Sequence, residues 1–233
     1  MAFNKSTDPE EEKKLDNPVW HAIAETHRHF GIDAENTKFY RPDYCPFGGI
    51  IKAENTSAPI TEYAALIDNF FIIGEQQPEI SDSLQLKTEL LGVQMIIYQK
   101  INFPITEEIV KLNKEKYAEL TDLVNLVQPG YFKNKTMLLG NYYGIIKNGQ
   151  LIAASGERMQ LNKYIEVSAV VTHPDHTGKG YAKQLVSHTV SKIFDQDKIP
   201  FLHAAATNTG AIQLYEKLGF HLRRKMSFWN IVR

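Results

Sequence analysis

The chain has 233 residues, of which 43% are hydrophobic and 23% charged, and its formal net charge is −1. This composition is typical of a globular protein with one large domain or two small ones. The near-neutral charge gives no overall attraction to nucleic acid or to an anionic membrane surface. No stretch approaches the roughly 18 apolar residues of a membrane-spanning helix. The single cysteine, Cys45, excludes an intramolecular disulfide and a cysteine-based metal cluster.

The first half of the chain predicts a solvated start followed by short elements. Residues 1–15 are polar and charged and have no apolar stretch typical of a signal peptide, so we expect a solvated tail and a cytoplasmic location. Asp16-Asn17-Pro18 offers capping and helix-start chemistry. The predicted elements are a helix at 19–30, a loop with a short strand at 38–51, a helix at 61–70, and strands at 71–74 and 91–101. Phe103-Pro104 then marks the expected boundary between residues 1–104 and 105–233.

The second half predicts a sheet whose strands alternate with helices. Asn148-Gly149 is a strong hairpin signal, because both residues tolerate a positive φ. The predicted elements are a helix at 107–127, strands at 141–146, 151–158 and 164–172, a helix at 181–194, a strand at 201–206, a helix at 211–218 and a strand at 222–232. This order indicates a mixed α/β sheet.

A strand that runs through Gly178-x-Gly180 into a helix is suited to holding a phosphate. Glycines allow a tight turn and a close approach of backbone N–H groups, and the helix directs its positive N-terminal end to the same place. By itself the pattern fits an ordinary tight turn equally well. The P-loop pattern and the dinucleotide fingerprint are both absent.

Two blocks of sequence resemble the GNAT superfamily of N-acetyltransferases. Residues 170–182, Val-Val-Thr-His-Pro-Asp-His-Thr-Gly-Lys-Gly-Tyr-Ala, are similar to the coenzyme A loop of that family, except that Thr177 stands where Arg or Gln is usual. Residues 208–220, Asn-Thr-Gly-Ala-Ile-Gln-Leu-Tyr-Glu-Lys-Leu-Gly-Phe, are similar to its second hallmark. The resemblance covers roughly residues 105–233 and is closest to the glycine N-acyltransferase-like branch.

The resemblance implies a fold, a co-substrate and a set of contacts. The implied fold is α/β (α+β), with a GNAT-type mixed, mostly antiparallel twisted sheet flanked by helices. Residues 1–104 look like a degenerate GNAT-like half with a lid or substrate-shaping role, although Trp20, Tyr40 and Phe47 fit a plain core equally. The implied co-substrate is acetyl-CoA, with no metal. The residues implied to contact it are Val170, Val171, Thr172, Thr177, Gly178, Lys179, Gly180, Tyr181, Ala182, Asn208 and Tyr215.

Transfer of an acyl group from a thioester to an amine requires a proton acceptor, an oxyanion site and an acid for the thiolate. The resemblance implies that Tyr215 protonates the thiolate and that backbone N–H groups at 170–172 meet the oxyanion. Tyr215 could instead only pack against the sheet. For the base we expect Glu166 from the strand 165–171, with Glu157 as its competitor and water as a third route. An ion pair with Arg158 is the alternative role of Glu157.

Several alternatives stay open at this point. His173 and His176 are three residues apart, and His188 and His203 are nearby in the sequence. No carboxylate accompanies them at a recognised ligand spacing, so we expect solvated or loop-stabilising histidines. The expected acceptor is a small-molecule or peptide amine, the expected assembly a monomer or homodimer, and no nucleic acid or membrane partner is expected. The rival functions are a non-catalytic acyl-CoA sensor and an aminoacyl-tRNA-dependent transferase, against which the near-neutral charge counts.

Overall fold

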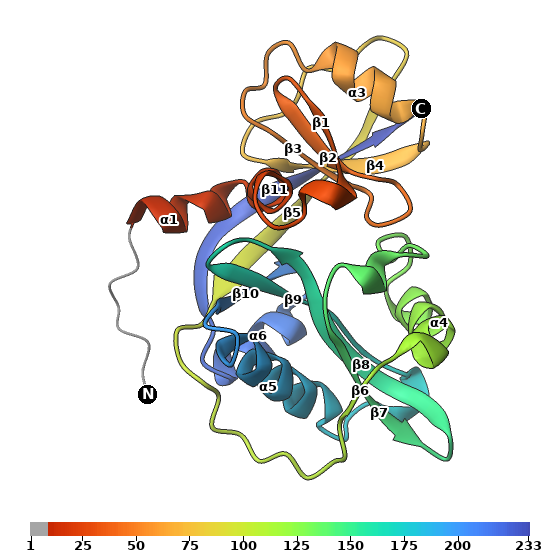
Figure 1. The fold of residues 1–233 in the computed structure, drawn as a ribbon, viewed down its shortest axis with the longest axis vertical. Helices are drawn as coiled ribbons and strands as arrows, with labels where there is room; N and C mark the ends of the chain where they lie inside the picture. Colours follow the sequence, from red (N-terminus) through yellow and green to blue (C-terminus); the bar gives the residue numbers. More distant parts are fainter. Residues whose placement is uncertain (1–8) are drawn as a thin grey trace.

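One continuous sheet runs through the computed structural model, which describes residues 9–233 (Figure 1). Across these residues the strand order is β1-β2-β3-β4-β11-β5-β10-β9-β8-β7-β6. The strands are β1 Gly31–Ala34, β2 Thr37–Tyr40, β3 Phe47–Ile50, β4 Asn69–Gly74, β5 Gln85–Ile96, β6 Val110–Lys111, β7 Tyr142–Lys147, β8 Gln150–Gln160, β9 Tyr164–Thr172, β10 Ile199–Ala205 and β11 His221–Val232. Only β3 with β4 and β9 with β10 pair in parallel among them. The prediction of a mixed, mostly antiparallel sheet flanked by helices is therefore confirmed.

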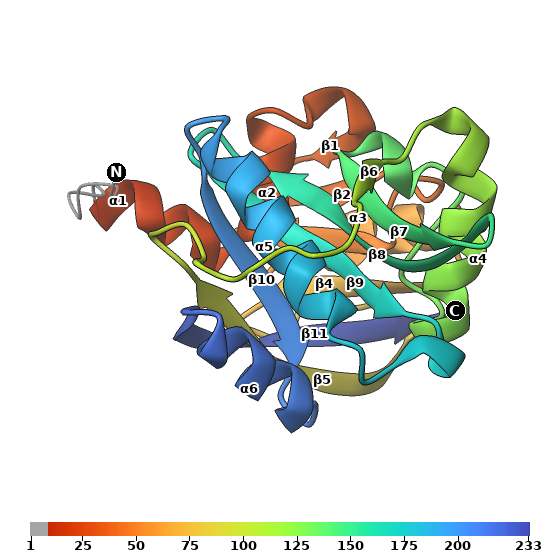
Figure 2. The ribbon, with the colours of Figure 1, turned by 90° about the horizontal axis from the view of Figure 1, so that it is seen from below.

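Six α-helices are found in the described part of the chain. They are α1 Pro9–Lys13, α2 Pro18–Ala24, α3 Ser57–Ala64, α4 Tyr117–Val127, α5 Tyr181–Phe194 and α6 Thr209–Lys217. Helix α5 packs against β8, β9 and β10 on one face of the sheet, as Figure 2 shows. Helix α4 packs against β8 and β9 on the opposite face of the sheet, with Leu120 and Leu123 against Ala154 and Val171. Among these six helices none combines the length and apolar character that crossing a bilayer requires.

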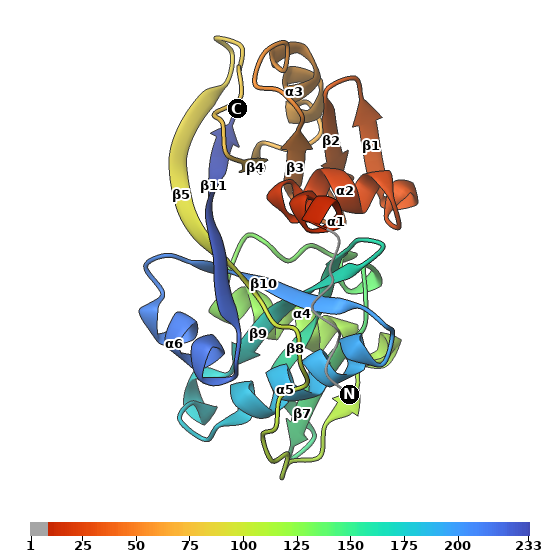
Figure 3. The same ribbon diagram turned by 90° about the vertical axis from the view of Figure 1, so that its left-hand side faces the viewer.

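Strands β5 and β11 belong to both halves of the sheet (Figure 3). Residues 227–232 of β11 pair with β4, while the whole of β11 pairs antiparallel with β5. Residues 92–96 of β5 pair in turn with β10. The expected boundary at Pro104 therefore follows a strand, β5, that already lies in the sheet of the second half.

The predicted elements of the second half match the structure best. Helix α5 has the predicted bounds, because its apolar residues recur on one face and the glycine loop defines its start. The predicted helix at 107–127 begins only at Tyr117; Val110–Lys111 forms edge strand β6, so long-range pairing outweighs local helical preference there. The expected helix at 61–70 is α3, which lies earlier in the chain, at 57–64.

The expected solvated tail at 1–15 is wrong in its last part, and residues 1–8 lie outside the described residues. Residues 9–13 form α1, and the side chain of Leu15 is fully buried in the core below β5 and β11. Helix α2 then begins as the capping pattern predicts, with Asn17 accepting a hydrogen bond from the Trp20 N–H and Pro18 in the first turn. It ends at Ala24 rather than at Phe30.

Candidate active site

The glycine loop presents unused backbone donors at the start of α5. Gly178 and Gly180 both have a φ of 78°, a left-handed conformation that L residues rarely adopt. No residue of the described chain accepts a hydrogen bond from the N–H groups of residues 178–180. These donors and the first N–H groups of α5 therefore point to the kind of site that a phosphate occupies.

Thr177, which departs from the family pattern, stabilises the turn in which it lies. Its hydroxyl donates a hydrogen bond to the carbonyl of Pro174 at 3.2 Å, within the 3₁₀ turn Pro174–His176. The loop thus keeps its shape without a long side chain at this position. Anion binding here would rest on the backbone.

Strand β9 is bulged and separates from its neighbour at the centre of the sheet. Its pairing with β10 ends at Glu166, so from Val167 onward that edge of β9 is not paired to β10. The register against β8 shifts between Ala154 and Gly156, and Ala169 has a φ of 50°. A non-glycine residue in this region is strained, and such strain is concentrated at functional sites. The bulged residues 168–170 therefore lie in the part of β9 that is not paired to β10, where a gap opens between the two strands.

A cavity of about 410 Å³ opens at this gap. It is lined by β9, α5, β10 and α6 and by residues of β3, β5, β8, β11 and the loop after α4. The lining residues are Phe47, Leu90, Leu91, Gly92, Gln128, Tyr131, Arg158, Glu166, Val167, Ser168, Ala169, Val170, Ala182, His203, Ala204, Ala205, Asn208, Ala211, Leu214, Tyr215 and Phe228.

The structure brings together some of the expected coenzyme contacts. Val170, Ala182, Asn208 and Tyr215 all line the cavity. The Asn208 side chain also caps α6 by accepting a hydrogen bond from the Ala211 N–H at 3.1 Å, so the structural role considered for it is real. The remaining expected contacts do not line the cavity; these are Val171 and Thr172 of β9 and residues 177–181 of the glycine loop.

Tyr215 projects from α6 into the cavity. Its ring packs edge-on against Phe220 at 5.8 Å, and its hydroxyl has no hydrogen-bond partner among residues 9–233. Burial raises the pKa of Tyr215 to about 12. The phenol is therefore protonated at neutral pH, which is the state that a proton donor requires.

Glu166 lies in the cavity wall as the partner of a buried arginine. Arg158 donates from Nε and Nη2 to the two carboxylate oxygens, both at 2.8 Å, and its guanidinium lies 4.7 Å from the centre of the Phe47 ring. His203 Nδ1 is 2.7 Å from Glu166 Oε1. Burial acts to raise the pKa of Glu166, but the charge and hydrogen bonds of Arg158 and the hydrogen bond of His203 lower it to about 2. The carboxylate is thus ionised and weakly basic.

Glu157 points away from the cavity. It is fully buried and accepts hydrogen bonds from the backbone and side chain of Asn141 and from Gln196, at 2.9–3.2 Å. Burial raises the pKa of Glu157, with those hydrogen bonds acting in the opposite direction. The ion pair with Arg158 considered for Glu157 is instead made by Glu166.

Part of the cavity wall is aromatic and includes residues from the first half of the chain. Phe47 of β3 contacts both Tyr131 and Phe228, with ring centres 6.1 and 6.0 Å apart. Leu90 and Leu91 of β5 also line the cavity and are 40% and 45% exposed. Phe47 is therefore a core residue that also lines the cavity, and its substrate-shaping role stays a prediction.

Arg158 and His203 are site residues to which sequence reasoning gave no role in the site. The one available signal was the presence of charged residues inside strands rich in β-branched residues. Among residues 9–233 no group of three or more His, Cys, Asp or Glu side chains is arranged to hold a metal. His173 and His176 lie in the turn before the glycine loop, with ring centres 5.9 Å apart.

Comparisons with known proteins agree with this geometry. The family model of FR47-like proteins matches residues 142–229. A solved structure from Novosphingobium aromaticivorans, described as an acetyltransferase of the GNAT family, shares 27% identity over 94% of this chain and 98% of its own, with a TM-score of 0.79. No curated protein matches the sequence significantly.

Two more distant structures share the fold. A GCN5-related N-acetyltransferase-like protein from Streptococcus suis has 16% identity over 96% of this chain and 98% of its own, with a TM-score of 0.62. A tandem GNAT protein from the clavulanic acid biosynthesis pathway has 13% identity over 83% of this chain and 77% of its own, with a TM-score of 0.56.

A splayed central strand, a glycine loop that opens a helix and a cavity between them define a protein of the acyl-transfer class. The sequence and the fold are similar to those of the GNAT superfamily of N-acetyltransferases. The resemblance found in residues 170–182 and 208–220 is thereby confirmed at the level of the superfamily. Its narrower assignment to the glycine N-acyltransferase-like branch stays a prediction.

Proposed function

We propose that the protein transfers an acetyl or small acyl group from its coenzyme A thioester to a primary amine by direct transfer. One observation carries the proposal: a single cavity is lined by the open edge of β9, by Ala182 in the first turn of α5, by Tyr215 and by the rings of Phe47, Tyr131 and Phe228. A thioester donor and an amine acceptor would meet inside this cavity. Cys45 is fully buried in the core and burial raises the pKa of its thiol to about 12, so a cysteinyl intermediate is not part of the proposal.

The residues present fit acetyl-CoA as the co-substrate. The free N–H groups of residues 178–180 and the first turn of α5 would hold its pyrophosphate. Ala182, Ala204 and Ala211 leave a narrow apolar passage between α5, β10 and α6 that suits an extended pantetheine arm. The bulged backbone at 168–170 would donate to the thioester carbonyl and stabilise the oxyanion.

Proton transfer at the reacting centre would divide between Tyr215 and water. Attack by a neutral amine forms the C–N bond, and the C–S bond breaks as Tyr215 gives its proton to the thiolate. The carboxylates were expected to take the amine proton. Glu166 is held by Arg158 with a pKa of about 2, and Glu157 faces away from the cavity, so we propose that the proton leaves through water. Glu166 would then act as the charge partner of Arg158.

The first half of the chain is proposed to shape the acceptor site. Phe47 and Leu90 come from residues 1–104 and line the cavity. Together with Tyr131 and Phe228 they favour an amine that carries an apolar group. We retain residues 105–233 as the catalytic half, the glycine N-acyltransferase-like branch and a cytoplasmic location as parts of the same proposal.

A titration with acetyl-CoA followed by an amine panel tests the proposal. Acetyl-CoA should raise Tm because a ligand that binds only the folded state stabilises it by mass action. Thiol release should then depend on an added amine and give an N-acylated product by mass spectrometry. No shift in Tm at millimolar acetyl-CoA would reject the coenzyme site. A shift without turnover on any amine would favour an acyl-CoA sensor.

A further inference from the structure

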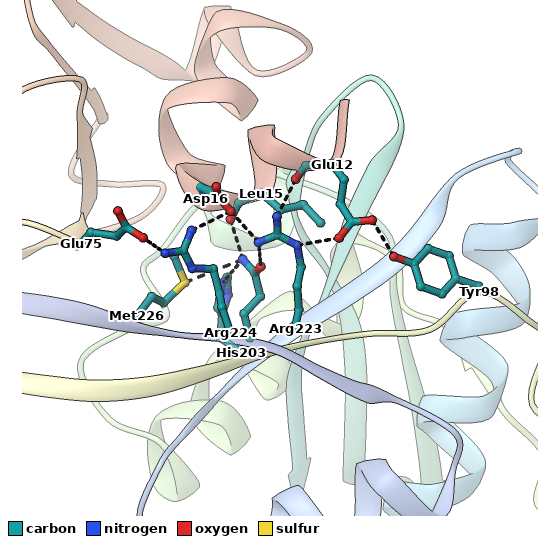
Figure 4. Close-up of polar contacts among 10 residues, drawn as sticks. Glu12, Leu15, Asp16, Glu75, Tyr98, His203, Arg223, Arg224 and Met226 are labelled. Atoms are coloured by element: carbon teal, nitrogen blue, oxygen red, sulfur yellow. Dashed lines mark hydrogen bonds and ion pairs between the residues drawn. The ribbon is translucent and has the colours of Figure 1, made fainter. Parts of the chain in front are cut away.

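A line of buried polar side chains connects the N-terminal segment to the cavity. Figure 4 shows the part of this line that ends at His203. It passes from Arg223 on β11 through Gln94 on β5 to His203 on β10 and ends at the Glu166–Arg158 pair. Gln94 is fully buried, and His203 exposes 5% of its side chain. Buried polar groups of this kind require partners, and each partner constrains the next.

The amide of Gln94 can take only one orientation. Its Oε1 accepts from Arg223 Nη1 at 2.9 Å, and its Nε2 donates to the carbonyl of Leu15 at 2.8 Å. Arginine has only donors and a carbonyl has only acceptor sites. Turning the amide over would place donor against donor and acceptor against acceptor. The protein surroundings thus fix which end of Gln94 faces His203.

This orientation determines the protonation of His203. Gln94 Nε2 lies 3.1 Å from His203 Nε2, so the histidine nitrogen must accept the hydrogen bond. The ring proton then resides on Nδ1, which donates to Glu166 Oε1 at 2.7 Å. A doubly protonated ring would direct an N–H at the N–H of Gln94. The other neighbours of the ring are Phe201 and Phe228, both edge-on at 5.6 Å.

The N-terminal segment holds Arg223, the residue at which the line of polar side chains begins. Arg223 donates from Nε and Nη2 to the side chain and carbonyl of Glu12, at 3.1 and 2.9 Å, and its Nη1 lies 2.7 Å from Asp16. The adjacent Arg224 pairs with the same Asp16 at 2.7 Å and with Glu75; it lies opposite Gln94 in the sheet, but its side chain makes no hydrogen bond to the Gln94 amide. Burial acts to raise the pKa of Asp16, and hydrogen bonds from the two arginines lower it overall.

We propose that Gln94 is a positioning residue of the active site, which holds His203 as the neutral Nδ1–H tautomer and thereby fixes Glu166 against Arg158. Arg223, braced by Glu12 and Asp16, holds Gln94 in turn. Residues 12–16 therefore help to position the side chains of a site whose other residues lie more than a hundred positions away in the sequence, except for those of β3 and β5. The effect on turnover rests on the proposed acyl transfer, whereas the tautomer does not.

The tautomer is measured directly by long-range ¹H–¹⁵N correlation spectra of the histidine rings in the full-length protein. Loss of one signal set in the His203→Asn variant assigns His203. We expect a protonated Nδ1 and an unprotonated Nε2 at neutral pH. In Gln94→Glu the donor to Nε2 is replaced by an acceptor, so both ring nitrogens should be protonated. A wild-type ring protonated on Nε2, alone or with Nδ1, would overturn the proposal whatever the activity.

Two adjacent arginines supply a matched comparison. Arg223→Gln should allow both tautomers of His203 and lower kcat by about 10²-fold, the scale of a small displacement in an active site. Arg224→Gln removes the same charge one residue away and should leave the His203 spectrum and kcat unchanged. Equal spectra and equal rates in the two variants would reject the role of Arg223.

The kinetic test separates positioning from simple folding. Gln94→Leu should lower kcat by a similar factor while the Tm shift produced by acetyl-CoA is retained, because the coenzyme passage is not altered. Wild-type kcat in folded Gln94→Leu would refute the positioning role. The expected tautomer in a protein that acylates no amine would support the hydrogen-bond line and reject the proposed function instead.

Discussion

The phenols of Tyr215 and Tyr143 are alike in acidity and differ in what they face. Burial raises the pKa of both to about 12, yet Tyr215 lines the cavity while Tyr143 packs against His188 of α5. Only Tyr215 is placed to give a proton to a leaving thiolate. Comparing the Phe variants of these two tyrosines therefore distinguishes the effect of losing a buried hydroxyl from the effect of losing a proton donor.

We expect Tyr215→Phe to lower kcat by about 10²–10⁴-fold, the range of a positioned general acid. The affinity for acetyl-CoA, measured by calorimetry, should change little because the ring is retained. Tyr143→Phe should keep the wild-type kcat. An unchanged kcat in Tyr215→Phe would remove the residue from the chemistry and leave only its packing against Phe220.

Glu166 and Arg158 are strongly dependent on each other because both are buried. Glu166→Gln leaves the guanidinium without its counter-charge, and breaking a buried pair in this way costs about 3–5 kcal/mol. Urea unfolding measures the loss. Glu119→Gln, which removes an exposed pair with Lys116, should cost about 1 kcal/mol or less. Equal losses would show that the Arg158–Glu166 pair is solvated.

At the scale of elements, the glycine loop depends on backbone conformation rather than on space. A Cβ at Gly180 would meet no atom within 4 Å, so the cost of Gly180→Ala comes from its φ of 78°, about 1–2 kcal/mol. Gly149, in the β7–β8 hairpin, has a φ of 80° and equally open surroundings.

We therefore expect Gly180→Ala and Gly149→Ala to lower the free energy of unfolding by similar amounts. Only Gly180→Ala should weaken the binding of acetyl-CoA, because it disturbs the N–H groups at the start of α5. Calorimetric titration of both variants makes the comparison. Equal acetyl-CoA affinity in the two would show that the pyrophosphate is held elsewhere.

Elements with strong local signals could be predicted from the sequence, and those formed by distant pairing could not. Helix α5 has the predicted bounds because a glycine loop precedes its apolar face. Residues 107–116 carry a helical pattern, yet Val110 pairs with β7 at the edge of the sheet. Strand β1 was missed because its four residues carry no alternation, with only one of them exposed.

The residues of the candidate site also divide into those that the sequence could predict and those that it could not. The glycine loop and Tyr215 lie inside contiguous motifs, which a single sequence displays. Arg158, Glu166 and His203 come from three strands and are separated by 8 and 37 residues. The pairing of β8 with β9 and of β9 with β10 brings them together. Glu166 was noticed as a carboxylate within an apolar strand, but its partners and its low pKa depend on tertiary contacts.

The stability of the whole molecule should fall as the pH drops from 7 to 4.5, partly through one histidine. His27 is buried against Tyr40, with Nδ1 2.9 Å from the hydroxyl, and burial lowers its pKa from 6.5 to about 4. Between these values the unfolded chain binds a proton that the folded chain does not, so acid favours unfolding. At 1.36 kcal/mol per pKa unit the loss is about 2 kcal/mol.

Urea unfolding at pH 7 and pH 4.5 measures this loss. In His27→Gln the side chain is neutral at both pH values, so the drop in unfolding free energy should be smaller than in the wild type by about 2 kcal/mol. The same drop in both proteins would place the acid sensitivity in other groups, such as His21 and His188, whose pKa values burial also lowers.

The position of β11 has a consequence for folding during synthesis on the ribosome. Residues 227–232 are synthesised after the other described strands, yet they pair with β4 and complete the sheet of the half that is made earlier. Until β11 has been synthesised, the nascent first half exposes the edges of β4 and β5, which are open to pairing with other chains. The sheet should therefore close only after β11 emerges from the ribosome, and chains stalled or cut before His221 should be substrates for chaperones and proteases.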